Sequence, residues 1–449
     1  MEFQLGRLNK AREQLGEPPI ELDKLEFEKP FIENDRLVDK DTHKVIGTKG
    51  DMYTKQILYK VLTEGCMDHD PRPRYFDEYK NASYKRYILT EDGNRFVLDD
   101  DDIVKEEEGK IIVSSSGNSE LTEEFKNAKY ERYVFCDGEV ITVNPKDEVE
   151  IHANFIRVKV PAHTLSVNEG IQCTYDLSKG ESPITTLRPQ AIKSFIAEIL
   201  WIYRDQSTDL VEFDELLGNK TWDDSTPYVY DPNKEDPNHK IHNWWEQWAL
   251  RNPDGSYKLN EKGHPYIGTT YGEIIRRREM IKKLIEDIKN NPDGRRNIVC
   301  MWQVDDFKEP HGLKPCAYET VWNVRHGWDG VDYLDMTLHQ RSSDFCTAGC
   351  INQAQYVALQ IVIAAELNLQ PGYFTWKPTN VQIYDRHINQ AIEMLGRDPV
   401  DISGVIKLRE GAKFATMTAD DIYIEGLVTT AEKEKVKKKN PQLKFPIGV

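Results

Sequence analysis

The sequence predicts an α+β protein. Segments with strand character and segments with helix character alternate irregularly along the 449 residues, which differs from the regular strand–helix–strand order of a doubly wound sheet. Residues 190–204 and 351–368 place apolar side chains at helical spacing, whereas residues 75–155 combine short strands with Asp-Gly turns. We therefore expect an α+β fold that includes a β-rich module.

The first 75 residues predict one helix between two irregular segments. Residues 1–50 are polar and patchy, which indicates an irregular arm. Residues 51–65 carry apolar side chains near helical spacing, and Gly65 is placed to end that helix. The following loop, 70–74, is stiffened by two prolines and contains Arg72 and Arg74.

Residues 75–155 contain a duplication. Segment 81–89 followed by Asp92-Gly93 resembles segment 127–135 followed by Asp137-Gly138. Each copy has the pattern of a strand, an Asp-Gly turn and a second strand, which is typical of a β-hairpin. The acidic runs between the copies, 99–102 and 106–108, favour solvated loops over a cation site.

The rest of the chain mixes strands and helices. Glu198 lies within the apolar pattern of the helix predicted at 190–204, and residues 213–265 have the composition of surface loops. The remaining expected elements are strands at 156–160, 171–175, 296–304, 321–325, 334–339, 373–376 and 380–384, and helices at 274–290, 351–368 and 386–395.

Composition and charge exclude several classes of protein. A net charge of −17 disfavours nucleic-acid binding, because a polyanion requires a basic field. No run of 18 apolar residues is present, and the amino terminus lacks the apolar core of a signal peptide, so we expect neither membrane insertion nor secretion. The seven cysteines are scattered without a C-x-x-C pair, which predicts free thiols in a cytoplasmic protein and no metal site.

Cys316 is the candidate nucleophile. It follows Pro315 and precedes a predicted strand, so its backbone lies at the edge of an element. The reactive form of a cysteine is the thiolate, and guanidinium groups such as those of Arg295, Arg296 and Arg341 would lower the thiol pKa from about 8.5. The alternative is a buried, unreactive cysteine.

Several polar and aromatic residues are candidates for binding. Arg341 and Ser342 combine a guanidinium fork with a hydroxyl, a suitable clamp for phosphate, and Arg295-Arg296 is a second anion candidate. The alternative for both pairs is a surface ion-pair network.

The Asn352 amide places a donor beside an acceptor, which complements the O4 and N3–H edge of uracil, although helix capping would also explain it. Burial would raise the pKa of Glu198 and suit it to proton transfer, unless it is solvated at the margin of its helix. Trp245 and Trp248 could stack on a flat ligand or fill an aromatic core.

Taken together, these residues resemble the thymidylate synthase family, which includes pyrimidine-nucleotide hydroxymethylases. The resemblance covers about residues 51–74 and 155–449 and divides the chain into an arm (1–50), the start of the core (51–74), an inserted module (75–155) and the main core (156–449). The motifs that carry it are Thr164-Leu165-Ser166, Pro183-Ile184-Thr185-Thr186, Glu198-Ile199-Leu200-Trp201, Trp245-Glu246-Gln247-Trp248, Tyr271-Gly272, Asp293-Gly294-Arg295-Arg296, Pro315-Cys316, Gln340-Arg341-Ser342-Ser343-Asp344, Asn352, Ile383-Tyr384 and the tail from Lys444 to Val449.

The resemblance implies a three-layer fold, in which a large mixed sheet is packed by helices. It also implies a folate-dependent methyltransferase that converts dUMP to dTMP. Cys316 would attack C6 of the uracil, and 5,10-methylenetetrahydrofolate would supply the one-carbon unit as co-substrate. The roles implied for the other residues are proton transfer (Glu198, Tyr271), phosphate binding (Arg72, Arg341, Ser342, and Arg295 and Arg296 from the second subunit of a homodimer), base and ribose recognition (Asn352, Tyr384), and folate contact and closure (Trp245, Trp248, Leu313, Asp344, Val449).

The sequence departs from the family pattern at three positions. Ala317 replaces the usual histidine after the nucleophile, Gln382 replaces a histidine near the ribose, and Ala348 replaces a glycine near the folate. A dUMP hydroxymethylase, in which water rather than hydride reaches the one-carbon unit, is the alternative activity. A nucleotide-binding homologue without catalysis is a further alternative that the retained Cys316 and Glu198 disfavour.

Overall fold

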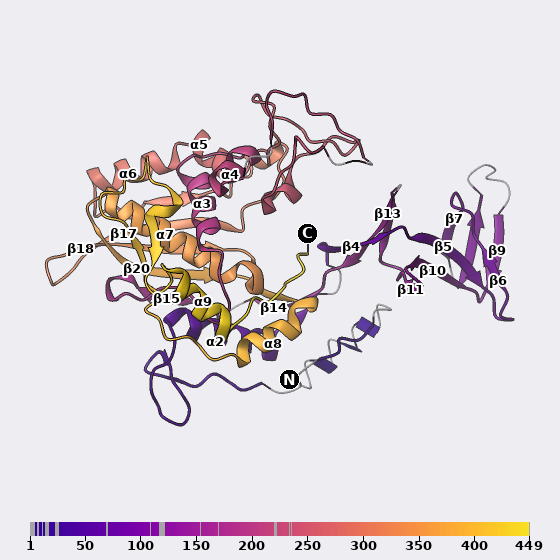
Figure 1. Ribbon diagram of the computed structural model, residues 1–449, viewed down its shortest axis with the longest axis horizontal. Coiled ribbons are helices and arrows are strands. Elements are labelled where there is room, and N and C mark those ends of the chain that lie inside the picture. The colour runs from indigo at the N-terminus through magenta and orange to yellow at the C-terminus, as the bar shows by residue number, and fades with distance from the viewer. Residues whose placement is uncertain are drawn as a thin grey trace. The chain divides into compact units, whose positions relative to one another are not determined.

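The computed structural model describes residues 5–448, with gaps at 7–8, 11, 14–17, 23–26, 69–70, 108, 116–121, 153, 169, 220–221, 233 and 235. The chain forms two compact units. The larger unit consists chiefly of Glu21–Asp68 and Thr164–Pro446, and the smaller unit consists chiefly of residues 71–163 (Figure 1).

A five-stranded mixed sheet forms the centre of the larger unit. Its strand order is β15-β20-β18-β17-β16. The pair β18–β20 is parallel and the other pairs are antiparallel, so the predicted α+β class with a mixed sheet is confirmed. The strands are β15 (Cys173–Asp176), β16 (Ile298–Cys300), β17 (Ala317–His326), β18 (Asp332–Gln340) and β20 (Gln370–Pro378).

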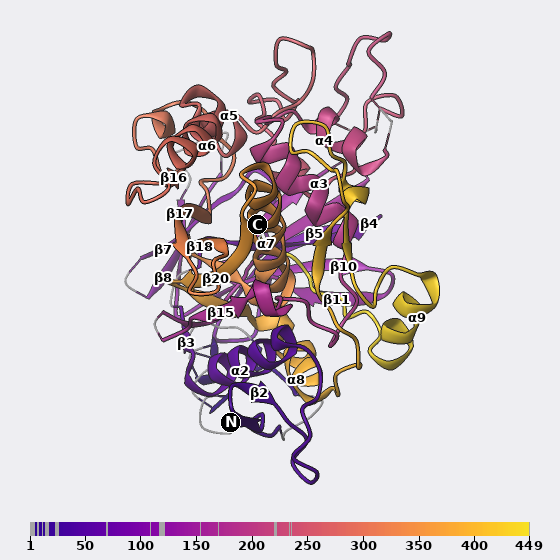
Figure 2. The ribbon, with the colours of Figure 1, turned by 90° about the vertical axis from the view of Figure 1, so that its left-hand side faces the viewer.

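Two apolar helices cover one face of this sheet. Helix α7 (Cys350–Glu366) contacts β18 and β20, and α3 (Ile192–Tyr203) packs against α7 (Figures 1 and 2). Alternate residues of the strands point toward the helices, and Trp322, Leu338 and Trp376 are fully buried there. Burial of both faces of α7 explains why its sequence is apolar almost all round.

A second, four-stranded sheet lies in the same unit. Its order is β19-β21-β14-β3, and it combines β3 (Cys66–Met67), β14 (Thr164–Val167), β19 (Ser343–Asp344) and β21 (Val381–Tyr384). Helices α2 (Lys49–Glu64) and α8 (Ile388–Gly396) pack beside it. Helix α2 begins with a capping box between Thr48 and Asp51, so it starts two residues before the predicted span of 51–65.

Some elements differ from the sequence prediction. The segment expected as loop contains helix α4 (Leu210–Leu217), which Asp209 caps at its start and Gly218 ends at φ 84°. The single helix expected at 274–290 is two helices, α5 (Gly272–Arg277) and α6 (Met280–Asn290), because Glu279 adopts a φ of 50° that interrupts the helical backbone. The remaining elements of this unit are β1 (Ile32–Glu33), β2 (Arg36–Leu37), β22 (Ile406–Leu408), β23 (Ile422–Ile424) and α9 (Thr430–Lys439).

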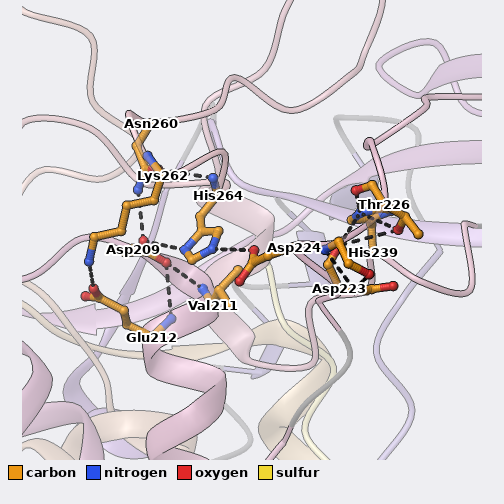
Figure 3. A network of polar contacts seen from close by, with 11 residues as sticks. Asp209, Val211, Glu212, Asp223, Asp224, Thr226, His239, Asn260, Lys262 and His264 are labelled. Atoms are coloured by element: carbon orange, nitrogen blue, oxygen red, sulfur yellow. Dashed lines mark hydrogen bonds and ion pairs between the residues drawn. The ribbon is translucent and has the colours of Figure 1, made fainter.

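The segment around α4 is pinned by a histidine between two carboxylates (Figure 3). His264 Nδ1 lies 2.8 Å from Asp209 and Nε2 lies 2.9 Å from Asp224. Asp209 also accepts hydrogen bonds from the backbone of Val211 and Glu212 at the start of α4. Burial alone would lower the pKa of His264, but the charges and hydrogen bonds of the two aspartates outweigh it, and the pKa is raised.

Between residues 71 and 163, the regular elements that the structure describes in the smaller unit are all strands. Its strands are β4 (Arg74–Lys80), β5 (Ser83–Leu89), β6 (Arg95–Val97), β7 (Ile103–Glu107), β8 (Lys110–Ser114), β9 (Thr122–Lys126), β10 (Lys129–Cys136), β11 (Glu139–Thr142), β12 (Glu148–Ile151) and β13 (Phe155–Pro161). The segments predicted as hairpins are present as β5–β6 and β10–β11.

The two copies of the duplicated segment exchange strands. Strands β5 and β10 pair antiparallel with Arg86 opposite Arg132, Ser83 opposite Phe135 and Leu89 opposite Lys129, so the register is centred on the two equivalent arginines. Counted outward from the equivalent strands β5 and β10, the first copy comprises β4 to β8 and the second comprises β9 to β13. Strand β4 of the first copy pairs with β13 of the second, and β9 of the second copy pairs with β8 of the first. Each apolar core therefore draws on both copies: one contains Ile88, Leu98, Ile111 and Val113 with Phe125, and the other contains Val134, Val143, Ile156 and Val158 with Tyr79.

Candidate active site

Cys316 lies immediately before β17, in the larger unit. Its thiol is half-buried, and Arg341 Nη2 lies 3.5 Å from Sγ. The Arg341 N–H donates to the Cys316 carbonyl at 2.9 Å, so the residue is held at the edge of the β17–β18 pair. Burial raises the pKa of the thiol above its ordinary value, and the Arg341 charge and the Tyr271 hydroxyl offset this only in part. Arg341 therefore changes the thiol pKa in the predicted direction, but its effect is smaller than that of burial.

The Arg341 guanidinium is positioned by backbone carbonyls. Its Nε donates to Pro315 O at 2.9 Å, and its Nη2 donates to Lys314 O at 2.8 Å. The guanidinium also lies 5.6 Å from the ring centre of Trp302. The side chain is only partly buried, so a charged donor beside the thiol remains accessible to a ligand.

Tyr271 joins the nucleophile to the aromatic part of the site. Its hydroxyl accepts a hydrogen bond from the Cys316 N–H at 2.9 Å, and its ring centre lies 5.2 Å from that of Trp245. Burial raises the pKa of the phenol well above 10. Tyr271 also adopts a φ of 39°, a backbone conformation that non-glycine residues rarely adopt and that often occurs at functional sites.

Glu198 is a buried carboxyl group on α3. Its Oε1 accepts from Trp245 Nε1 at 2.5 Å and from Trp244 Nε1 at 3.1 Å, while Oε2 accepts from Gln355 Nε2. Burial raises the pKa of the carboxyl group, and the three hydrogen bonds act in the opposite direction. Glu198 therefore faces the site, and the alternative of a solvated position at the margin of the helix is wrong.

Asn352 lies on the first turn of α7, and both ends of its amide are held. Its Nδ2 donates to Gln355 Oε1 at 3.1 Å, and its Oδ1 accepts from Gln340 Nε2 at 3.1 Å. Helix capping does not explain this residue, because it lies inside α7 and its amide bonds to side chains.

Asp344 and Tyr384 lie on the paired strands β19 and β21. Asp344 accepts from the Thr347 hydroxyl, and its Oδ1 lies 3.7 Å from His387 Nδ1. Burial raises the pKa of Asp344, against the effect of nearby His387 and Arg188. Tyr384 is buried, and burial likewise raises its pKa. Ser342 is partly exposed, and its hydroxyl donates to Gln382 at 3.4 Å.

The chain's tail packs beside Asp344. His387 Nε2 bonds to the Pro446 carbonyl, and the Phe445 ring lies 5.2 Å from the His387 ring and 5.1 Å from the Arg188 guanidinium. Val449, expected to close the site, lies outside the described residues.

The aromatic candidates form a connected group. Trp245 is buried between Trp201, Trp248 and Tyr271, with ring centres 5.2–5.9 Å apart. Leu313 is partly exposed, and its carbonyl accepts from Thr270. Of this group, Trp248 is partly exposed, whereas Trp201, Trp245 and Tyr271 are buried.

Three arginines expected at the site are not brought to Cys316 within the larger unit. Arg295 and Arg296 are exposed before β16, with no hydrogen-bond partner among the described residues. Arg72 is exposed in the smaller unit, where Arg74 donates to the carbonyls of its own loop, including that of Arg72.

Sequence reasoning missed two glutamines that connect the site. Gln340 and Gln355 lie on either side of Asn352, and Gln355 reaches Glu198. The i, i+3 spacing of Asn352 and Gln355 on one helix was the available signal. Among the described residues, no group of three His, Cys, Asp or Glu side chains is arranged to hold a metal ion, and all seven cysteines are free thiols.

Known proteins match this chain over the larger unit. The profile of the family described as "Thymidylate synthase" matches residues 157–437. The thymidylate synthase of Lactococcus lactis subsp. lactis (strain IL1403) is 37% identical over 278 residues, which cover 62% of this chain and 84% of the relative. That of Streptococcus sanguinis (strain SK36) is 38% identical over 277 residues, 61% of this chain and 84% of the relative. The solved structure of thermostable thymidylate synthase A from Bacillus subtilis is 26% identical, with a TM-score of 0.49, covering 65% of this chain and 88% of that one.

Proposed function

Because the chain belongs to the thymidylate synthase family, we propose that Cys316 starts the reductive methylation of dUMP to dTMP, with 5,10-methylenetetrahydrofolate as the co-substrate. The enzyme is a folate-dependent methyltransferase. The observation that supports the assignment of the site is the set of contacts around Cys316: Arg341 lies beside its thiol, and Tyr271 links it through Trp245 to Glu198. Gln355 then connects Glu198 to Asn352.

The reaction begins at the thiol. The Cys316 thiolate adds to C6 of the uracil, which makes C5 nucleophilic, and C5 then bonds to the one-carbon unit of the folate. Loss of the C5 proton and of the folate leaves a methylene group on C5, and a hydride from the folate reduces it to methyl while Cys316 departs. The products are dTMP and dihydrofolate. Division into a covalent sequence replaces one difficult substitution by several easier steps.

The environment of Cys316 suits a thiol that reacts only when substrate is bound. Burial keeps the free thiol protonated near neutral pH, whereas Arg341 at 3.5 Å favours the thiolate. In the proposal, Arg341 and Ser342 hold the nucleotide phosphate beside the thiol, Asn352 reads the uracil edge and Tyr384 contacts the ribose. These contacts fix the distance between Sγ and C6, which is a large part of such a rate acceleration.

Glu198 and Tyr271 are proposed to take part in proton transfer. The raised pKa of Glu198 lets it hold a proton closer to neutral pH than an exposed carboxyl group can. Tyr271 contacts Cys316 through its hydroxyl and Trp245 through its ring, and Trp245 in turn donates to Glu198. Tyr271 is therefore placed to link the nucleophile to the carboxyl group.

The folate is proposed to bind against the aromatic group beside Glu198. Trp245, Trp248 and Leu313 supply a flat apolar wall, and Asp344 supplies a carboxyl group for the polar edge of the pterin. Closure of the tail, ending at Val449, would exclude water from the methylene group, since water would divert the reaction to a hydroxymethyl product.

We further propose that the enzyme works as a homodimer in the cytoplasm. Arg295 and Arg296 are exposed and unpaired within the described chain, as expected of side chains that complete a phosphate site in a second subunit. Ile298 and Tyr373, on strands of the five-stranded sheet, are also exposed, as expected of side chains that meet a second subunit.

The test is one incubation with dUMP and methylenetetrahydrofolate, with the nucleotide product identified by mass and dihydrofolate by absorbance. We expect dTMP and dihydrofolate. Cys316→Ser should lower kcat at least about 10⁴-fold, whereas Cys300→Ser, which changes a partly buried thiol on β16, should not. Hydroxymethylated nucleotide with tetrahydrofolate would instead identify a hydroxymethylase, and undiminished turnover in Cys316→Ser would refute the nucleophile.

A further inference from the structure

Gln355 connects Asn352, the proposed base-reading residue, with Glu198, the proposed proton-transfer residue. It lies one helical turn after Asn352 on α7 and is buried. Its Nε2 donates to the Phe195 carbonyl at 3.1 Å and to Glu198 Oε2, and its Oε1 accepts from Asn352 Nδ2 at 3.1 Å.

The chemistry of these partners allows the Gln355 amide only one orientation. A backbone carbonyl accepts hydrogen bonds and never donates them, so the end of the amide at Phe195 has to be the NH₂ group. This anchor does not depend on whether Glu198 is ionised. The oxygen of Gln355 therefore faces Asn352, and only the NH₂ end of Asn352 can face it in return.

A second glutamine imposes the same orientation from the other side. The indole N–H of Trp376 only donates, and it bonds to Gln340 Oε1 at 2.8 Å. Gln340 Nε2 is thus directed to two acceptors, the Ser342 carbonyl at 2.9 Å and Asn352 Oδ1 at 3.1 Å. Both neighbours place the oxygen of Asn352 toward Gln340 and its nitrogen toward Gln355.

The fixed Asn352 amide keeps one N–H and one oxygen lone pair for a ligand. Uracil presents an acceptor at O4 and a donor at N3, which this amide can meet. Cytosine presents a donor at N4 and an acceptor at N3, the reverse pattern, so Asn352 would have to turn over. Its oxygen would then face Gln355 Oε1 and its nitrogen would face Gln340 Nε2, which replaces two hydrogen bonds by two repulsive contacts.

We propose that Gln355 is a specificity-determining residue, which selects uracil over cytosine by holding the Asn352 amide in a single orientation. The inference rests on the proposed function, because it concerns the same nucleotide site. Gln355 acts on the substrate through Asn352, so it is a positioning residue. Its contact with Glu198 also ties base recognition to the buried carboxyl group on α3.

The test compares the Kd values for dUMP and dCMP, measured by titration calorimetry on the full chain. Gln355→Met keeps an unbranched side chain of similar length but cannot form hydrogen bonds of this kind. We expect the ratio of the dCMP Kd to the dUMP Kd to fall by about tenfold or more, because a polar group that rejects the wrong ligand is lost. If Gln355 had a merely structural role, Gln355→Met would weaken the binding of both nucleotides equally. The ratio of the two Kd values would then stay unchanged, which would overturn the inference.

Two further variants sharpen the comparison. Gln353→Met is the matched control, since Gln353 is equally buried on α7 but bonds to the Tyr175 hydroxyl and the Gly349 carbonyl instead. The ratio of the dCMP Kd to the dUMP Kd should not change in this variant. Gln355→Glu should retain the selectivity near pH 6, because the new carboxyl group can share a proton with Glu198 while its other oxygen still accepts from Asn352. Loss of selectivity in Gln355→Glu equal to that in Gln355→Met would count against the inference.

Failure of the inference can be separated from failure of the proposed function. If the unaltered protein shows no preference for dUMP over dCMP, the nucleotide assignment itself is wrong. If the unaltered protein prefers dUMP and Gln355→Met keeps that preference, only the role of Gln355 is refuted.

Discussion

The reactive thiol of this protein is governed by two opposing influences on one residue. Burial disfavours the Cys316 thiolate, and the Arg341 guanidinium favours it. The balance in the free protein lies on the side of the thiol, so the group is protected from adventitious reaction until a ligand changes its surroundings.

Removal of the Arg341 charge should therefore shift the reactivity of Cys316 to higher pH. In Arg341→Met the thiolate loses its nearest cation, and the pKa of the thiol should rise further; Arg341→Lys should lie between that variant and the unaltered protein. The measurement is the rate of iodoacetamide alkylation of the Cys316 peptide against pH, by mass spectrometry. Exposed Cys66 serves as the internal reference, and an unchanged Cys316 profile in Arg341→Met would show that the guanidinium has no effect on the thiol.

Individual candidate residues could be picked out from the sequence where a short motif contains the groups that suggest their chemistry. Cys316 after a proline, the Arg341-Ser342 pair and the carboxyl group within the apolar stripe of α3 can each be recognised along the chain, and the structure brings Cys316, Arg341 and Glu198 into one connected group. Gln340 and Gln355 were not recognised, because their importance comes from partners more than 30 residues distant, Trp376 and Glu198. The pKa of Cys316 could not be inferred either, since it depends on burial by elements that are remote in sequence.

At the scale of elements, polar residues decide where helices begin and end. Asp209 caps α4 and also binds His264, so one carboxylate fixes both the helix and the segment that covers it. The composition of residues 213–265 conceals this helix, because the cap and the stop at Gly218 enclose only eight residues. The break between α5 and α6 at Glu279 was likewise missed, since a glutamate carries no signal for a positive φ.

The His264 link should stabilise this region at low pH more than at high pH. The folded-state pKa of His264 is raised, so its contribution is fully present below the unfolded value of about 6.5 and is lost as the pH rises through the folded value. His264→Gln should therefore increase hydrogen exchange in α4 strongly at pH 6 and only slightly at pH 9, relative to the unaltered protein at the same pH.

A second histidine provides the control for this experiment. His326 also lies between two carboxylates, Asp332 and Asp293, but it is exposed, so His326→Gln should have little effect because surface ion pairs contribute little. An equal effect of His264→Gln at both pH values would refute a contribution from the charged imidazole.

At the scale of the whole molecule, the proposed phosphate site would be completed by a second subunit. Arg341 lies beside the Cys316 thiol, whereas Arg295 and Arg296 are exposed and form no ion pair among the described residues. The proposed dimer would supply these two arginines to the partner's phosphate site.

Two inactive variants should restore activity when they are combined. Cys316→Ser lacks the nucleophile but keeps its arginines, and Arg295→Ala/Arg296→Ala keeps Cys316. In a mixed dimer one of the two sites has both, so refolding the variants together should recover activity of the order of a quarter of the unaltered protein, from the statistical share of intact sites. Mixtures of each variant with the unaltered chain, at matched concentration, calibrate the assay. If the mixture of the two inactive variants recovers no activity, the shared site is refuted.

The exchange of strands in the smaller unit carries a consequence for how this region could have arisen. With Arg86 facing Arg132 at the centre of the register, the two copies are arranged as two identical chains would be about a two-fold axis. A single copy supplies the buried residues of one core but lacks the strand and the side chains, such as Phe125 or Tyr79, by which the other copy covers that core. The ancestral segment would therefore have needed a second polypeptide to complete its core. Tandem duplication would then have turned an association between two molecules into a contact within one chain. The effective concentration of one copy around the other would no longer depend on how much protein a cell makes.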